Sequence, residues 1–292
     1  MEFATKPIEF ADKEDMERIR MQSSNVLSAH TFDSLYLWQS QMKLSLCRKK
    51  ELFLVRCGIR GANTWFFPCG DRTETEAFIR SGMEKHDFAL CYIGEAEAEW
   101  LTKTFPDAWE LHREEESDEY VCRITDYIGL SGGTYLGVRH KINRILREHE
   151  LETRLLTPET MADAGTVVSE WEKLSHHVGD HKLEEGGVSR QALSEADRLE
   201  LEGVVVYLEG EPMAVFAGFP INADTIDALI GKCRHDAPRG FIYYAVREFF
   251  QSVRNSYTFC NLEEDLGIPG IRLIKEAMRP ERKNLIWTAV QR

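Results

Sequence analysis

The stretch VVVYLEGEPMAVFAGFPINADTIDALIGKCRHDAPRGFIYYAVREFF, residues 204–250, decides the fold of this chain. Three runs within it, 204–208, 213–221 and 225–233, are rich in β-branched and aromatic residues, and the turn sequences Glu-Gly-Glu-Pro and Asn-Ala-Asp separate them. Connections this short favour an antiparallel meander. Apolar residues then recur every three or four positions, which predicts a helix over 241–253.

The elements on either side of this stretch complete a recognisable order. Hydrophobic periodicity and turn residues predict strands at 151–156, 257–262 and 284–290 and helices at 159–174, 189–200 and 271–278. The order β-α-α-β-β-β-α-β-α-β resembles that of the GNAT fold, the N-acetyltransferase fold. This resemblance is one of architecture and does not by itself assign an activity.

The N-terminal half repeats this order about 150 residues earlier. Predicted strands lie at 7–10, 43–47, 51–57, 63–69 and 88–94, and further strands lie near 108–112 and 119–123. Predicted helices lie at 12–21, 31–40, 73–86 and 95–104. We therefore expect an α+β (α/β) protein with tandem GNAT-like domains, 1–123 and 124–292, each with a mixed, largely antiparallel sheet flanked by helices. The alternative is that any α+β chain alternates in this way.

The composition narrows the possible partners. The chain has 292 residues, 36 Lys+Arg, 49 Asp+Glu and a net charge of −13, which argues against DNA as a partner. We find no signal-peptide pattern and no run approaching the ~18–20 apolar residues of a membrane span. A cytoplasmic protein without a transmembrane segment is therefore expected. The seven cysteines form no C-x-x-C pair, and we interpret them as reduced core residues.

One basic segment contrasts with this acidic background. Residues 139–147 carry Arg139, Lys141, Arg144 and Arg147 and no acid, whereas 91–119 holds ten acids and two bases. On a helix, Arg139, Asn143 and Arg147 share one face and can bind phosphates of a cofactor or of tRNA. The alternative is an ordinary solvated helix face.

A second candidate site lies at the start of the helix 241–253. Arg239 and Gly240 follow a predicted strand, and a helix N-terminus with a guanidinium suits a pyrophosphate. GNAT enzymes bind acyl-CoA pyrophosphate at this place, but Phe241 and Ile242 stand where a second small residue is expected. The alternative is a plain turn after Pro238.

A third candidate is the turn after the strand 257–262. Glu263, Glu264 and Asp265 can orient or deprotonate an acceptor amine, and together they would raise one another's pKa if buried. Helix capping in a solvated turn is the alternative. His176, His177 and His181 lie in a glycine-containing loop, and we predict no metal site there.

These three segments together resemble a family of uncharacterised bacterial proteins related to the C-terminal catalytic domain of phosphatidylglycerol lysyltransferases. The matching residues are Asp126, Tyr127 and Ile128; Gly132, Tyr135, Arg139, Ile142, Asn143 and Arg144; Lys232 before Arg239 and Gly240; and Asn261, Glu263, Glu264, Asp265, Leu266, Gly267, Gly270, Ile271 and Arg272. Lysines that the family often carries around 133–138 are absent, and Leu262 replaces an arginine. A weaker grip on phosphate or tRNA is one consequence.

The resemblance implies a tandem GNAT-like fold, similar to Fem-type enzymes that move amino acids from aminoacyl-tRNA. It also implies roles for the site residues: catalytic for Glu263, Glu264 and Asp265; donor binding for Arg139, Lys141, Asn143, Arg144, Arg239 and Gly240; and substrate binding for Lys232, Asn261 and Arg272.

The expected function is an acyl- or aminoacyl-transferase whose site lies in the C-terminal domain. Acyl-CoA or aminoacyl-tRNA would be a donor substrate and not a permanently bound cofactor, and the acceptor would be an amine. A phospholipid acceptor is not expected, because the lysyltransferases proper use a membrane-spanning half that this chain lacks. The alternative is a non-catalytic tandem GNAT-like binding module that has lost donor binding.

Overall fold

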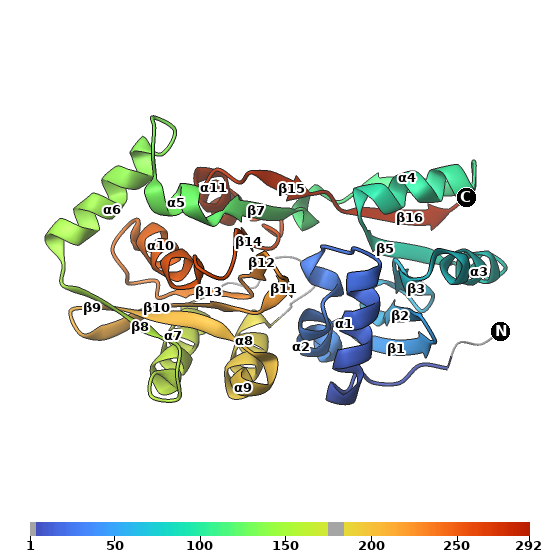
Figure 1. Cartoon of the computed structure of the whole chain (residues 1–292), viewed down its shortest axis with the longest axis horizontal. Helices are drawn as coiled ribbons and strands as arrows, with labels where there is room; N and C mark the ends of the chain where they lie inside the picture. The colour runs from blue at the N-terminus through green and yellow to red at the C-terminus, as the bar shows by residue number, and fades with distance from the viewer. Residues whose placement is uncertain (1–3, 175–183) are drawn as a thin grey trace. The chain divides into compact units, whose positions relative to one another are not determined.

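The computed structural model describes residues 4–174 and 184–292, which form two compact units (Figure 1). Unit 1 contains the chain up to Glu119 together with Asn284–Arg292, and unit 2 contains Tyr120–Lys283. No helix in these described ranges is both long enough and apolar enough to cross a membrane.

A four-stranded antiparallel sheet forms the centre of unit 2. Its order is β13-β10-β9-β8, with β8 (Leu151–Leu155), β9 (Glu202–Leu208), β10 (Glu211–Gly218) and β13 (Ile230–Cys233). The short turns between these strands explain the antiparallel pairing. Figure 1 shows α10 (Phe241–Val253) on one side of this sheet and α7 (Met161–Leu174) on the other.

A second sheet continues unit 2 in the order β11-β12-β14-β7-β15. Its strands are β11 (Pro220–Asn222), β12 (Thr225–Asp227), β14 (Phe259–Asn261), β7 (Glu119–Arg123) and β15 (Arg282–Asn284). Strands β12 and β14 are parallel, because α10 carries the chain back between them. The paired residues of β12 and β14 end at Asp227 and Asn261, and one further hydrogen bond joins the Ala228 N–H to Asn261 O at 2.9 Å. The chain then continues as β13, which pairs with β10 and not with β14. The two strands therefore diverge here.

The remaining helices cover these sheets. Helices α5 (Ile124–Gly129) and α6 (Leu136–Glu148) pack against α10, and their apolar residues share its core. The others are α8 (Glu185–Ser194), α9 (Ala196–Leu199) and α11 (Pro269–Ala277). The helix predicted at 189–200 thus begins earlier and is broken at Glu195.

Unit 1 repeats this plan around a sheet of order β1-β2-β3-β5-β16-β6, with β4 paired to β2. The strands are β1 (Leu44–Lys49), β2 (Leu52–Cys57), β3 (Thr64–Phe66), β4 (Cys69–Gly70), β5 (Ala89–Ile93), β6 (Trp109–Arg113) and β16 (Trp287–Gln291). The helices are α1 (Lys13–Gln22), α2 (Phe32–Met42), α3 (Arg72–Gly82) and α4 (Glu95–Thr104). As in unit 2, an antiparallel meander is followed by a helix and then by a strand that pairs in parallel with a strand of the meander. In unit 1 the helix is α3, and β5 pairs in parallel with β3. The predicted tandem GNAT-like α+β fold is confirmed.

Two predicted strands are wrong in detail. The strand at 7–10 is absent from the described fold, where Lys6 makes a single bridge to Leu46 and the chain turns into a 3-10 helix at Phe10–Asp12. The single strand at 284–290 is two strands, because the Ile286 N–H donates to Asp118 Oδ1 at 3.0 Å and separates β15 from β16. Strand β16 pairs with β5 and β6, so this end of the chain lies in unit 1 and not in the C-terminal domain where we placed it.

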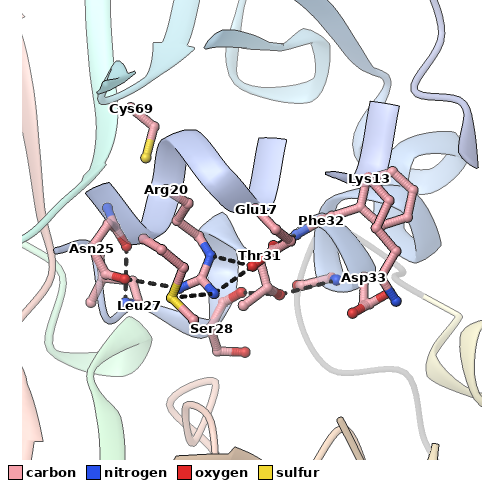
Figure 2. Close-up of polar contacts among 12 residues, drawn as sticks. Lys13, Glu17, Arg20, Asn25, Leu27, Ser28, Thr31, Phe32, Asp33 and Cys69 are labelled. Carbon is pink, nitrogen blue, oxygen red and sulfur yellow. Dashed lines mark hydrogen bonds and ion pairs between the residues drawn. The ribbon is translucent and has the colours of Figure 1, made fainter. Parts of the chain in front are cut away.

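A buried guanidinium organises the helical layer of unit 1 (Figure 2). Arg20 on α1 is 0% exposed; its Nε donates to Glu17 Oε2 at 2.9 Å and its Nη1 to Asn25 O at 2.9 Å. The other oxygen of Glu17 accepts the Phe32 N–H at 2.6 Å, and Phe32 is the first residue of α2. This ion pair therefore joins α1, the following loop and the start of α2.

Replacing the guanidinium should destabilise unit 1 strongly. We expect Arg20→Met to lower the free energy of unfolding by about 3 kcal/mol, because Glu17 is left without its charged partner. Urea unfolding followed by circular dichroism measures this loss. Arg80→Gln is the control, since Arg80 pairs with Glu76 on the exposed face of α3 and its loss should cost at most about 0.5 kcal/mol. Equal losses in the free energy of unfolding of the two variants would contradict the stabilising role given to the Arg20–Glu17 ion pair.

Candidate functional site

The turn after β14 is held in a specific shape next to the diverging strands. The side chain of Asn261 accepts the Glu263 N–H at 2.9 Å. Strand β7 fixes the same backbone, because the Tyr120 N–H donates to Glu263 O at 3.1 Å and the Leu262 N–H to Tyr120 O at 2.8 Å. Glu263 has a φ of 58°, a conformation that costs a non-glycine residue energy and is often found at functional sites. The turn thus places Glu263 and Glu264 where β12 and β14 diverge.

Asp265 is fully engaged within this turn. One oxygen accepts the Tyr120 hydroxyl at 2.5 Å and Arg272 Nε at 2.7 Å, and the other accepts the Gly267 N–H at 2.8 Å and Arg272 Nη2 at 3.0 Å. Burial alone would raise the pKa of this carboxyl, but the hydrogen bonds from Arg272, Tyr120 and Gly267 lower it to about 2. A carboxylate held this way positions the turn and is a poor proton acceptor at neutral pH.

The two glutamates before it have the opposite electrostatics. Burial raises the pKa of Glu263 well above its ordinary value, and the nearby carboxyl groups of Asp227 and Glu264 raise it further. Burial also raises the pKa of Glu264. The pKa of Lys275 on α11 is lowered by burial, and its Nζ donates to Leu262 O at 2.6 Å and to the Glu264 carbonyl. Burial thus shifts the pKa of all three groups in the direction that favours their uncharged forms, and shifts of this kind are common at functional sites.

Lys232 at the end of β13 belongs to the same group of charges. Its Nζ donates to Glu185 at the start of α8 and lies 4.3 Å from the ring centroid of Trp171. Attraction to Lys232 lowers the pKa of Glu185. Lys275 interacts electrostatically with Glu264, Glu263, Glu185 and Lys232. We call Glu185, Lys232, Glu263, Glu264 and Lys275 the carboxylate–lysine cluster.

A separate basic group surrounds the start of α10. Gly240 has a φ of 95°, and a Cβ there would lie 3.0 Å from the Cβ of Lys141 on α6. Arg144, one turn further along α6, donates to Arg239 O at 2.5 Å. The Nζ of Lys141 lies 4.4 Å from the ring centroid of Tyr243. Arg239, Gly240, Lys141 and Arg144 therefore lie together, and we call them the α10 entrance.

The chain resembles proteins of one known family over most of its length. Residues 20–290 match the family "Phosphatidylglycerol lysyltransferase, C-terminal". The chain belongs to this family. A conserved protein of unknown function from Bacteroides thetaiotaomicron VPI-5482 has 21% identity and a TM-score of 0.88, with 100% of both chains covered. No curated protein matches the sequence.

Other structures share the fold of this family member at low identity. L-PGS from Bacillus licheniformis has 14% identity and a TM-score of 0.67, with 99% of this chain and 94% of that chain covered. FemX has 7% identity and a TM-score of 0.61, with 98% and 96% covered. A tandem GNAT protein from the clavulanic acid biosynthesis pathway has 10% identity and a TM-score of 0.52, with 99% and 98% covered. These likenesses establish the tandem GNAT-like and Fem-type fold.

The predicted site residues lie in separate parts of the structure. Lys232, Glu263 and Glu264 lie in the carboxylate–lysine cluster, and Arg239, Gly240, Lys141 and Arg144 lie at the α10 entrance. Asn261, Asp265 and Arg272 shape the turn. Arg139 donates to Leu130 O and to Gly132 O, the latter at 2.9 Å, in the loop before its own helix, and Asn143 is exposed on α6. His176, His177 and His181 lie outside the described residues.

Several side chains of the candidate site carry no motif in the sequence. Tyr120, Asp227 and Glu185 come from distant elements, and no motif connects them to Glu263. The sequence gives a weak indication of Lys275, because it follows Arg272 by three positions and therefore lies on the same face of α11. In the sequence, Trp171 is one apolar position of the predicted helix 159–174 and gives no sign of its contact with Lys232.

The hydrogen bonds of Asp265 predict a specific pH dependence. Its folded pKa of about 2 lies below the ~3.9 of an unfolded aspartate, so the ionised form stabilises the fold above about pH 4 and this stabilisation disappears as the pH falls towards 2. Asp265→Asn should therefore reduce the free energy of unfolding at pH 7 and 5, and the difference from wild type should shrink by pH 3. Urea unfolding at each pH measures it.

Asp126→Asn on the exposed face of α5 controls for the loss of one negative charge. A difference between wild type and Asp265→Asn that stays constant from pH 5 to pH 2.5 would contradict the role given to these hydrogen bonds.

Proposed function

We propose that unit 2 is a transferase that moves an acyl or aminoacyl group from acyl-CoA or aminoacyl-tRNA to an amine, and that it acts in the cytoplasm. The carboxylate–lysine cluster at the divergence of β12–β13 from β14 carries this proposal. Glu263 lies where the pairing of β12 with β14 ends, and its raised pKa suits a group that takes a proton from an ammonium.

The α10 entrance supplies the binding site for the donor's phosphates. The N-terminus of α10 carries the positive end of the helix dipole, and Arg239, Lys141 and Arg144 add three cationic side chains around it. Gly240 keeps the backbone open at this point, because its conformation disfavours a side chain. The pyrophosphate of CoA and the phosphates at the end of a tRNA share the chemistry that this surface binds.

The reaction itself is a direct transfer. The acceptor amine loses a proton to Glu263, and its nitrogen attacks the donor carbonyl carbon. A new C–N bond forms as the C–S bond of a thioester or the C–O bond of an aminoacyl ester breaks. The leaving thiolate or alkoxide takes back the proton held by Glu263, and the new amide nitrogen releases its remaining extra proton to water. Much of the rate comes from holding the two substrates in this geometry. The name of the family, phosphatidylglycerol lysyltransferase, supports an aminoacyl donor.

One observation favours the alternative of a binding module. The Phe241 N–H already donates to Pro238 O at 2.9 Å and the Tyr243 N–H to Gly240 O at 3.1 Å. These two groups are then less available to a pyrophosphate than at an open helix start. A chain that binds a donor but transfers nothing would be such a module.

Glu263→Gln tests the chemical step. We expect kcat to fall about 100-fold with little change in KM, because the amide keeps the shape and cannot accept the proton. Transfer of labelled acyl and aminoacyl groups to amines measures it, with phosphatidylglycerol vesicles as a second acceptor. Glu276→Gln on the exposed side of α11 is the control. Unchanged transfer in Glu263→Gln would reject the proposed role of Glu263 in the chemical step. Transfer to phosphatidylglycerol but to no amine would mean that the acceptor is the lipid and not an amine.

Arg239→Gln tests the donor site. The KM for the donor should rise about tenfold with kcat nearly unchanged, because one charge-assisted hydrogen bond to phosphate is lost in the ground state and the transition state alike. Arg254→Gln at the other end of α10 is the matched control. Equal KM values for the two variants would place the donor elsewhere.

A further inference from the structure

Strand β8 forms an open edge of the central sheet of unit 2. Its residues, Leu151–Leu155, pair with β9 on one side, and no strand of the described part of the chain pairs with the other side. Just before the strand, the Glu209 N–H donates to Glu150 O at 3.0 Å. Just after it, the Leu156 N–H donates to Gly203 O at 2.8 Å. Hydrogen bonds to an antiparallel neighbour use every second residue, so the odd-numbered residues of β8 direct their N–H and C=O groups away from the sheet.

Most of these outward backbone groups are unused. Leu155 O accepts the Thr160 hydroxyl at 2.8 Å. The Leu155 N–H and both backbone groups of Leu151 and Thr153 have no hydrogen-bond partner among the described residues. Proteins usually block such an edge with a proline, a bulge or a lysine, because it pairs readily with another extended segment. Strand β8 contains no proline or lysine, and its register with β9 is regular.

The sequence of β8 indicates which segment fits this edge. Leu-Glu-Thr-Arg-Leu has a leucine at each end, opposite charges at its second and fourth positions and a threonine at its centre. When two copies pair antiparallel about Thr153, Leu151 lies opposite Leu155 of the second copy. Glu152 then lies opposite Arg154 of that copy. The strand is therefore complementary to itself, and this register uses the outward backbone groups of both copies.

The charged residues meet at the closer of the two spacings in such a pair. Glu152 and Arg154 occupy non-hydrogen-bonded positions of this register, where opposite Cβ atoms lie about 4.5–5.5 Å apart. Within one copy, Arg154 Nε donates to Glu152 Oε1 at 2.7 Å, and the two side chains are still 50% and 51% exposed. Pairing of the copies gives each carboxylate a second guanidinium and each guanidinium a second carboxylate.

The apolar residues of β8 favour the same register. Leu155 is 61% exposed, whereas Leu151 is half-buried and packs against the core that α10 shares. In the register about Thr153, Leu155 of each copy covers Leu151 of the other, which removes apolar surface from water. A register shifted by one residue would set Leu155 against Glu152 and lose both matches.

We propose that the chain forms a two-fold symmetric dimer through β8, in which the four-stranded sheets of two copies join into one continuous sheet. Two strands of this length bury less surface than a standard interface, so the dimer is weak, with a dissociation constant on the order of 100 µM. The dimer goes beyond the proposed transfer reaction, since β8 contributes no residue to the carboxylate–lysine cluster or the α10 entrance.

Analytical ultracentrifugation of the full chain tests this inference. We expect wild type to pass from monomer to dimer between about 10 µM and about 500 µM. Arg154→Glu and Glu152→Arg each set like charges opposite one another twice, and each should raise the dissociation constant more than tenfold. Lys103→Glu is the matched control, because it reverses one charge of an exposed ion pair on α4 and should leave the dissociation constant unchanged.

Mixing the two variants tests the register itself. Glu152→Arg chains carry two arginines on β8 and Arg154→Glu chains carry two glutamates, so the mixture should form heterodimers although neither variant pairs with itself. Circular dichroism checks that both variants are folded. Wild type that stays monomeric over the whole range, a dimer that neither reversal weakens, or a mixture of folded variants without heterodimers would overturn the proposal.

Discussion

The hydrogen bonds that converge on Asp265 are the constraint on which the site depends. They tie the turn after β14 to Tyr120 on β7 and to Arg272 on α11, which are far apart in sequence. The backbone of Glu263 has a left-handed conformation that a glutamate would not adopt unaided, and the surrounding contacts maintain it. Without this anchor, Glu263 and Glu264 would not be held where β12 and β14 diverge.

Within three residues, the same turn holds carboxyl groups whose pKa values are shifted in opposite directions. Asp265 is buried with four donors and has a lowered pKa, whereas Glu263 is half-buried beside other carboxyl groups and has a raised one. Burial disfavours the charge in both, and the difference is made by the neighbours. Asp265 therefore holds the turn in place, whereas Glu263, two positions before it, carries the more basic carboxyl group. Lys275, whose pKa is lowered by burial, completes the cluster from α11.

The sequence predicted the fold well because the deciding signals are local. The meander of 204–233 and the helix that follows it are visible in turn residues and hydrophobic periodicity, and their pairing follows from the short connections. The separation of the chain's last strand from β15 depends on a side chain at Asp118, which no local pattern shows. The site was predicted only where its residues are close in sequence. The turn at 263–267 and the pair Arg239 and Gly240 stand out in the sequence as candidates, but Glu185 and Asp227 meet Glu263 only through the tertiary fold.

The repeated plan also bears on the proposal that the transfer chemistry lies in unit 2. In both units one strand of the meander, β12 in unit 2 and β3 in unit 1, pairs in parallel with the strand after the helix. The N–H just after this meander strand donates to the carbonyl of the last paired residue: Ala228 to Asn261 O at 2.9 Å in unit 2 and Phe67 to Cys91 O at 2.8 Å in unit 1. Beyond this point unit 2 carries carboxyl and ammonium groups. Unit 1 carries Phe66 and Tyr92, whose rings are stacked with centroids 4.4 Å apart. Stacked rings cannot accept a proton from an amine, so the two copies of one fold differ in the residues that acyl transfer requires, and this difference supports unit 2 as the place where it occurs.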